Sequence, residues 1–328
     1  MNTTSPLNAG DMAWLLTSSG LVLLMTPGLA LFYGGMVRRT NLVSTMFQSF
    51  ISMSIVSLIW VFIGFSLSFG DSIGGFIGNP FTYLGFQNVG LEPNAAFAAT
   101  IPLALFALFQ MKFAIITPAL VSGAFSERIR MRAYLPFLVY FAIFIYAPVA
   151  HWAWHPDGFL RKMGVLDFAG GTVVHITAGI TALVCALVMK RRKNHIDASA
   201  TNIPFVLLGT GLLWFGWFGF NAGSALSANA QATQAFLTTH VASATAMLTW
   251  MAIEWFRNGS FTALGACIGA VVGLVAITPA AGFVSIGASV IIGAVSTSVS
   301  SAVVQWRTRT NIDDTLDVFP CHGVGGIV

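Results

Sequence analysis

The stretch Asp167-Phe-Ala-Gly-Gly-Thr-Val-Val-His175 opens one apolar segment of the sequence, and Asp317-Val-Phe-Pro-Cys-His322-Gly-Val-Gly-Gly opens another. In each stretch a carboxylate stands at the expected start of a helix, and a histidine follows one to two turns deeper. The two segments are five apolar segments apart. Because each repeat would then contain an odd number of membrane helices, the second repeat would have the inverted orientation in the membrane. This parallel predicts two inverted five-helix repeats, with a functional site near the midplane where they meet.

Apolar segments of about 20 residues, the length that crosses a bilayer as a helix, recur along the chain. We expect helices at about Met12–Met36, Val43–Phe69, Phe97–Ala124, Ala133–Trp152, Phe168–Met189, Ile203–Phe220, Ala232–Phe256, Phe261–Thr278, Phe283–Gln305 and from Leu316 onward. The last segment has only about a dozen residues before Val328, too few to cross a bilayer, so we expect a truncated tenth helix and an incomplete chain. The fold class predicted is an all-α polytopic membrane protein. Residues 1–328 would form a single membrane domain, with repeat one at about 12–190 and repeat two at about 203–328.

The composition supports a membrane protein. Charged residues make up 8% of the chain, against about 25% in ordinary soluble domains. Hydrophobic residues make up 56%, so most of the surface must face the lipid bilayer. This excludes a soluble protein, and the net charge of +4 gives no indication of nucleic-acid binding. The three cysteines lie in or beside apolar segments without a pairing pattern, and we assign no redox role, cofactor or metal.

The basic residues indicate the orientation of the chain. Twelve of them fall in loops that would share one side: Arg38, Arg39, Arg128, Arg130, Arg132, Lys190, Arg191, Arg192, Lys193, Arg257, Arg307 and Arg309. The opposite side has only Arg161 and Lys162. Because basic loops stay on the cytoplasmic side, the N-terminus is predicted to lie outside the cell.

His175 and His322 are the leading candidates for a transport path, because ionisable groups inside membrane segments are costly and usually mark a substrate or proton route. A neutral imidazole both donates and accepts hydrogen bonds, so two facing rings could offer polar groups to a small solute in a dry pore. Each histidine alone could instead bond to a neighbouring helix. Asp167 and Asp317 could instead be helix caps.

Four stretches resemble the ammonium transporter family (Amt/Mep/Rh) over nearly the whole chain. They are Thr26-Pro-Gly-Leu-Ala-Leu-Phe-Tyr-Gly-Gly35, the Asp167–His175 stretch, Trp214-Phe-Gly-Trp-Phe-Gly-Phe-Asn-Ala-Gly-Ser224, and Gly265 through Gly282. The resemblance implies a homotrimer in the cell membrane, with one pore per subunit and eleven helices in most members. It also implies an N-terminus outside, in agreement with the charge pattern.

The resemblance assigns roles to individual residues. Trp154 and Ser224 would form an outer recruitment site, where an indole face attracts a cation and a hydroxyl accepts its N–H. Phe113 and Phe220 would form a stacked gate below that site. The buried acid of the outer vestibule would be Asp167, and the dry pore would be lined by His175 and His322. The candidate pore residues also include Trp217, from the Trp214–Ser224 stretch, and Asp317, which opens the tenth segment.

The mechanism implied is capture of ammonium, its deprotonation near the phenylalanine gate, and passage of neutral ammonia, because a narrow apolar pore cannot replace the water around a cation. Potassium has no proton to lose and would be excluded. An enzyme is not indicated: the sequence has no His-Glu-x-x-His and no Gly-x-Ser-x-Gly motif.

Two features depart from the family pattern. The first is His155-Pro156-Asp157-Gly158 after Trp154, where the family usually has Gly-Gly-Gly. His151 and His155 have the i,i+4 spacing of a metal pair, but no third ligand is evident, and a polar loop is the favoured interpretation.

The second is Lys112, beside the gate candidate Phe113. A lysine at mid-membrane costs about 3 kcal/mol. If its charge lay within ~8 Å of the permeating cation, repulsion of ~2 kcal/mol would suppress flux. The lysine could also face another helix or subunit. The charged alternative supports a second hypothesis, an ammonium-sensing receptor that conducts poorly and signals to a cytoplasmic output module or regulator beyond Val328.

Overall fold

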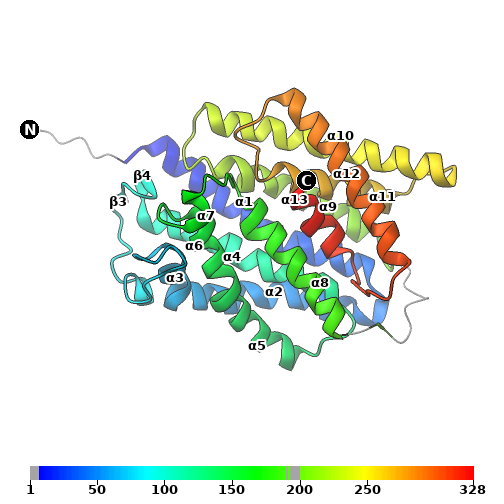
Figure 1. Ribbon diagram of the computed structural model, residues 1–328, viewed down its shortest axis with the longest axis horizontal. Helices are drawn as coiled ribbons and strands as arrows, with labels where there is room; N and C mark the ends of the chain where they lie inside the picture. Colours follow the sequence, from blue (N-terminus) through cyan, green and yellow to red (C-terminus); the bar gives the residue numbers. More distant parts are fainter. Residues whose placement is uncertain (1–6, 190, 193–199) are drawn as a thin grey trace, which may run out of the picture.

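The computed structural model describes residues 7–189, 191–192 and 200–328. Long helices run side by side along the longest axis of the molecule, and short strands and turns gather at the end where the chain begins (Figure 1). The N-terminal half contains α1 (Ala9–Met36), α2 (Leu42–Ile59) with α3 (Phe65–Phe69), α4 (Leu103–Phe125), α5 (Met131–Phe141), α6 (Ala147–Trp154), α7 (Phe159–Lys162) and α8 (Thr177–Met189). The C-terminal half contains α9 (Ile203–Gly223), α10 (Ala230–Asn258), α11 (Ala263–Ile277), α12 (Ile286–Thr308) and α13 (Gly325–Ile327).

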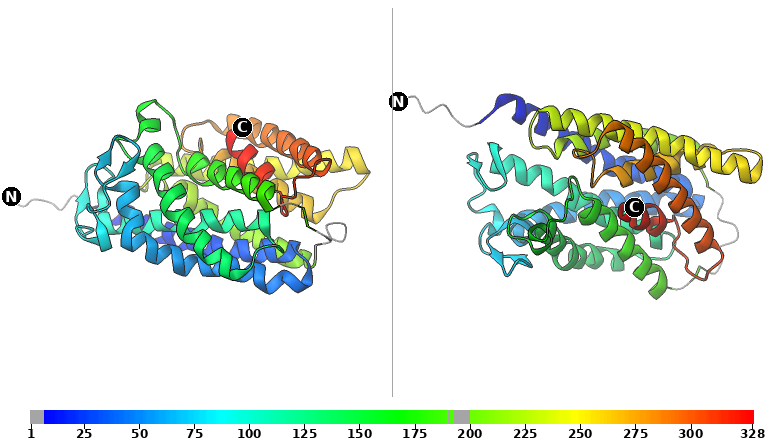
Figure 2. Two further views of the ribbon diagram at one scale, coloured as in Figure 1. Left: turned by 60° about the horizontal axis from the view of Figure 1, so that its bottom comes forward. Right: turned by 45° about the horizontal axis from the view of Figure 1, so that its top comes forward.

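Several helices contain short wide turns of the π type. These are η2 (Trp60–Gly64), η4 (Ala142–Tyr146), η5 (Gly171–Ile176) and η6 (Phe319–Val324), and the tight 3-10 turns η1 (Arg39–Asn41) and η3 (Leu84–Phe86) lie in loops. η5 runs into α8, and η6 runs into α13 inside the bundle, next to α8 and α12 (Figures 1 and 2). Because π turns inside helices are often functional, the position of both candidate histidines in η5 and η6 is informative.

The predicted membrane fold is confirmed. Among the described residues, eight helical stretches are long and apolar enough to cross a bilayer, and α11 is a ninth, shorter apolar helix. η6 and α13 begin the tenth. The nine and a half predicted segments therefore each correspond to a helix. The division into repeats at about 12–190 and 203–328 stays a prediction.

The predicted start of the third helix at Phe97 is wrong, since α4 begins at Leu103. Residues Ala98–Pro102 form strand β4, which pairs antiparallel with β3 (Pro93–Asn94). A second small sheet joins β1 (Ser72–Ile73) and β2 (Ile77–Gly78). Hydropathy cannot separate a short apolar strand from the first turn of a helix, so the strictly all-α prediction missed these strands.

Helices α1 and α9 approach each other closely because small residues line their contact. A side-chain Cβ at Gly209 would lie 2.4 Å from the backbone nitrogen of Phe32, and one at Gly216 would lie 2.2 Å from Met25 Cγ. In membranes such residues let helices approach until their backbones touch. These glycines therefore allow close packing of α1 against α9.

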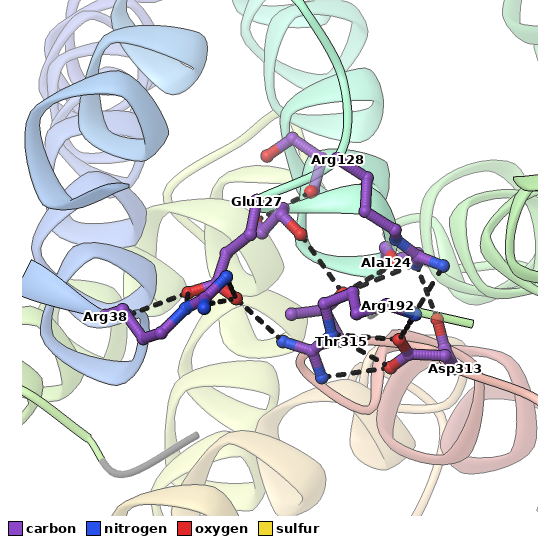
Figure 3. Close-up of polar contacts among 9 residues, drawn as sticks. Arg38, Ala124, Glu127, Arg128, Arg192, Asp313 and Thr315 are labelled. Carbon is purple, nitrogen blue, oxygen red and sulfur yellow. Dashed lines mark hydrogen bonds and ion pairs between the residues drawn. The ribbon is translucent and has the colours of Figure 1, made fainter. Parts of the chain in front are cut away.

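Charged residues at the end of the bundle opposite the N-terminus form one connected cluster: Arg38, Glu127, Arg128, Arg192 and Asp313 (Figure 3). We call this cluster the inner clamp, because the charge pattern of the sequence predicts that this end is cytoplasmic. Glu127 accepts from Arg38 Nε at 3.0 Å and from Arg192 Nη1 at 3.1 Å. Arg192 also donates to both carboxylate oxygens of Asp313. The clamp joins the α1–α2 turn, the α4–α5 turn, the residues after α8 and the loop after α12.

The clamp changes the acidity of its carboxylates. Burial alone would raise the pKa of Glu127, but hydrogen bonds from Arg38 and Arg192 outweigh it and lower that pKa. The pKa of Asp313 is lowered in the same way by Arg192 and Arg128. A depressed carboxylate pKa stabilises the fold above the unfolded value of about 4 and loses that contribution as the pH falls below it. The clamp is therefore at full strength at neutral pH.

We expect Glu127→Gln to destabilise the protein by about 3 kcal/mol, because it leaves two partly buried arginines facing an uncharged amide. The measurement is thermal unfolding of the purified protein in detergent. The matched control is Arg39→Gln, which changes an exposed neighbour of Arg38 and should leave the melting temperature unchanged. Equal melting temperatures for both variants would mean that the clamp contributes nothing to stability.

Candidate transport pathway

The candidate pathway begins at a vestibule of about 280 Å³ at the end of the bundle where α1 begins, which the charge pattern predicts to be the outer end. Its lining includes Trp154, Ser224, Gln110 and Asp167. The indole N–H of Trp154 donates to the carbonyl of Asp167 at 3.1 Å, which fixes the ring plane. The hydroxyl of Ser224 donates to the carbonyl of Phe220 at 2.8 Å, so its oxygen lone pairs are available to accept from a ligand.

Two phenylalanines contact each other next to Trp154 of the vestibule. The rings of Phe113, from α4, and Phe220, from α9, have centroids 4.3 Å apart and planes inclined by 39°. Both side chains are buried. Phe113 also contacts Trp154 edge to face at 5.7 Å, while Phe220 lines the next cavity inward. The phenyl pair therefore lies between Trp154 of the vestibule and that cavity.

Below the phenylalanines the pathway is narrow. A cavity of about 10 Å³, roughly enough for the centre of one water molecule, is lined by His175, His322, Trp217 and mostly apolar side chains. His322 also lines a cavity of about 30 Å³, which has Asp317 in its wall. Asp317 in turn lines an inner vestibule of about 380 Å³ beside the inner clamp. Shared lining residues thus connect the histidines to the inner surface.

The two histidines contact each other directly. Nδ1 of His175 lies 3.2 Å from Nδ1 of His322, and the rings are nearly parallel, with an interplanar angle of 25°. In a neutral pair one Nδ1 carries the proton and the other accepts it, so one Nε2 is an acceptor and the other is an N–H donor. His175 Nε2 is buried with no partner among the described residues. The pair can therefore both accept from and donate to a small solute.

Asp167 positions His175 through the backbone. Its carboxylate accepts four backbone N–H groups, from Gly170, Gly171, Thr172 and Val173, at 2.7 to 3.0 Å. Gly170 has φ of +114°, a left-handed conformation that favours glycine. Asp167 therefore acts as a helix cap, which was the alternative interpretation of this residue. The cap holds the turn that carries His175.

The prediction that Asp317 corresponds to Asp167 is wrong. The side chain of Asp317 pairs with Arg307 Nε at 2.5 Å. The carboxylate that caps the second histidine turn is Asp314, whose Oδ2 accepts from Phe319 N at 2.6 Å. The interval from Asp314 to His322 equals the interval from Asp167 to His175. That equal spacing was the signal in the sequence that we missed.

Three further residues complete the site. Trp217 stacks on His175 with centroids 5.3 Å apart and an interplanar angle of 15°. Its indole N–H donates to Thr278 Oγ1 at 2.9 Å. Gln110 lines the vestibule, and its buried Oε1 has no partner among the described residues. The sequence analysis included Trp217 and missed Gln110 and Thr278, although an amide inside an apolar span is a signal of its own.

The His151 and His155 rings stack at 4.3 Å but do not form a metal site. The two ring nitrogens of His151 are engaged, by the Ser68 carbonyl at 3.0 Å and the Ser72 hydroxyl at 2.8 Å. His155 Nδ1 accepts from the backbone N–H of Asp157 at 3.0 Å. Neither the His151 nitrogens nor His155 Nδ1 is free to bind a cation, and the polar-loop interpretation accounts for these residues.

Lys112 points away from the pathway. Only Ala104, Leu108 and Lys112 are not buried in α4, and their spacing puts them on one outward strip. Lys112 Nζ lies 4.0 Å from Met111 Sδ, and Lys112 is absent from the lining of the vestibules and of the histidine cavity. Of the two orientations considered for Lys112, the structure has the one away from the pore, toward another helix or subunit.

A bundle of membrane helices with a vestibule, a pair of stacked phenylalanines and a small cavity lined by two histidines is typical of an integral membrane protein that handles a small polar solute. The comparisons with known proteins identify its family. The profile of the Ammonium Transporter Family matches residues 13–328. The chain belongs to the ammonium transporter family.

Known relatives agree over almost the whole chain. The ammonium transporter of Aquifex aeolicus is 49% identical, over 98% of this chain and 75% of its own length. The crystal structure of Saccharomyces cerevisiae Mep2 superposes with a TM-score of 0.91 at 38% identity, over 98% of this chain and 72% of Mep2. A structure described as a sensor Amt protein superposes with a TM-score of 0.90 at 29% identity, over 97% of this chain and 80% of that one.

We expect Lys112→Met to leave ammonium flux within about twofold of wild type, because its charge lies outside the pathway. Flux is measured in proteoliposomes, with Lys112→Arg as the charge-retaining control. A tenfold gain in Lys112→Met that is absent in Lys112→Arg would instead mean that the lysine charge reaches the gate, as a repulsion of ~2 kcal/mol predicts.

Proposed function

We propose that the protein moves ammonium across the membrane through the passage from Trp154 to His322. Ammonium is captured in the outer vestibule, transfers a proton to the water that fills this vestibule above Phe113 and Phe220, and crosses as neutral ammonia along the histidines. The observation that carries this proposal is the contact of 3.2 Å between His175 and His322 in a cavity of about 10 Å³ directly below the phenylalanine pair. The family membership supports the choice of ammonium as the solute.

The vestibule suits a cation with N–H donors. The indole of Trp154 offers an aromatic face, and the Ser224 hydroxyl and the Gln110 amide oxygen are acceptors. The Asp167 carboxylate adds a negative charge, held in place by four backbone N–H groups. Capture at this point needs no protein charge in direct contact with the solute, so release inward remains easy.

Deprotonation follows from the size of the histidine cavity. A passage about one water wide cannot hold the hydration shell of a cation, and the neutral imidazoles do not replace it. Ammonia has lost the charge and keeps N–H donors and a lone pair, so both Nε2 atoms can bond to it. Potassium cannot shed its charge and is rejected at the phenylalanines.

An ammonium sensor is the alternative function. Because a structure described as a sensor Amt protein has a similar fold, the fold by itself is compatible with either function. The outward direction of Lys112 removes the feature that favoured a poorly conducting pore. Ammonium-evoked flux in proteoliposomes separates the two: a transporter conducts, and a sensor binds ammonium with little flux.

We also propose a homotrimer in the cell membrane with the N-terminus outside. His240 is exposed on α10, ten residues after its outer end at Ala230, a depth of about 15 Å. An exposed ionisable group near the middle of a bilayer is costly. Cover by a second copy of the chain would relieve that cost. The position of the inner clamp supports the orientation, since basic residues favour the cytoplasmic side.

Replacing either pore histidine with leucine should lower ammonium flux about tenfold, the effect of losing one hydrogen bond worth ~1.4 kcal/mol. The oligomer should stay intact in size-exclusion chromatography, because the pair lines a path and does not hold the core. His240→Gln, a histidine outside the pathway, serves as the matched control. Wild-type flux in both His175→Leu and His322→Leu would remove the pair from the mechanism.

Phe220→Ala should open the pathway to water, since both rings are needed to close the vestibule. Osmotic water permeability of proteoliposomes, followed by light scattering, should rise several-fold. Phe218→Ala is the control, because Phe218 stacks on Phe236 at 3.9 Å on the other side of α9. If the two variants are equally impermeable, the role of Phe220 is packing alone.

A further inference from the structure

The indole of Trp217 is held by one specific hydrogen bond outside the pathway. Trp217 is 2% exposed, and its N–H donates to Thr278 Oγ1 at 2.9 Å. The Thr278 hydroxyl donates to the carbonyl of Leu274 at 2.8 Å. Because the single hydroxyl proton is used there, the Thr278 oxygen can only accept from Trp217. The direction of the bond is therefore fixed.

Thr278 is itself anchored to the turn that carries His175. It follows the last residue of α11, and the next residue, Pro279, accepts the backbone N–H of Phe168 at 3.0 Å. Pro279 also packs tightly against Gly171, where an added Cβ would lie 2.4 Å from Pro279 Cβ. The acceptor for the indole and the turn that carries the histidine thus belong to one rigid corner.

The bond determines what the indole presents to the passage. Trp217 and His175 line the same cavity with stacked rings, and His175 Nε2 is buried without a partner among the described residues. In the tautomer in which His175 Nδ1 donates to His322, this Nε2 is an acceptor. An indole N–H released from Thr278 would be an unsatisfied donor in a dry site, which is costly. It could gain a partner by turning toward Nε2, in competition with the permeating solute.

We propose that Thr278 is a positioning residue of the pathway. By accepting the Trp217 N–H outside the passage, it keeps the indole flat against His175 and leaves His175 Nε2 free for ammonia. This inference rests on the proposed conduction along the histidines. The inference gives Thr278, at the end of α11, a role in orienting a pathway residue in addition to its role in packing.

The test is a double-mutant cycle on ammonium flux in proteoliposomes, with thermal unfolding and chromatography to verify assembly. Thr278→Val keeps the shape and removes the acceptor, and we expect flux to fall about tenfold, which corresponds to ~1.4 kcal/mol. Thr278→Ser keeps the hydroxyl and should restore flux to within about twofold of wild type. Trp217→Phe has no N–H to position, so Thr278→Val should cause no further loss in that background.

Two results would overturn the inference: wild-type flux in Thr278→Val, or an equal loss from Thr278→Val with and without the Trp217 indole. If Thr278→Val does not assemble, Thr278→Cys, whose sulfur is a weak acceptor, takes its place in the cycle. A cryo-EM structure of the variant gives an answer independent of flux. An indole turned from its wild-type position supports the inference, and an unmoved indole contradicts it. A wild type without flux contradicts the proposed transport and leaves this structural comparison valid.

Discussion

The carboxylate of Asp167 accepts four backbone N–H groups at the point where the fifth membrane helix begins. In a bilayer no water can satisfy such groups, and each unsatisfied one costs several kcal/mol. The cap therefore permits an irregular turn at this depth. That turn carries His175 and contacts the rest of the pathway: the Asp167 carbonyl orients Trp154, and the neighbouring Phe168 is bound to Pro279.

The same solution recurs on the other side of the passage. Asp314 caps the turn that carries His322, so each histidine has a carboxylate at the base of its own turn. Asp313, beside it, belongs to the inner clamp with Arg192. The position of the second histidine is thereby linked to the α4–α5 and α1–α2 turns at the inner surface. Charges are concentrated at the two ends of the pathway, and the histidine cavity between them is lined by imidazole, indole and apolar side chains.

The sequence predicted the membrane segments because hydropathy over about 20 residues depends little on neighbours. It predicted both histidines because ionisable residues are rare in such segments. The sequence did not predict the role of a residue where that role depends on its interaction partner in the fold. Asp317 and Asp314 are both acids before the same turn, and only the fold shows that Arg307 pairs with the first. The direction of Lys112 depends on which faces of α4 are buried, and its apolar sequence is too uniform to reveal them.

In the transport that we propose, the uncharged histidine cavity and the charged ends of the pathway would together allow selectivity and throughput to coexist. A fixed charge inside the passage would bind ammonium firmly and slow its release, or repel it. With the Asp167 carboxylate bound to four backbone N–H groups and Lys112 turned outward, the solute would meet the acceptors, the aromatic faces and the exposed Arg161 of the vestibule, and the two imidazoles below. The barrier to a cation is then its own lost hydration, which rejects every ion that cannot give up its charge. Discrimination comes from the chemistry of the solute, and the protein needs only to keep the passage narrow, dry and correctly oriented.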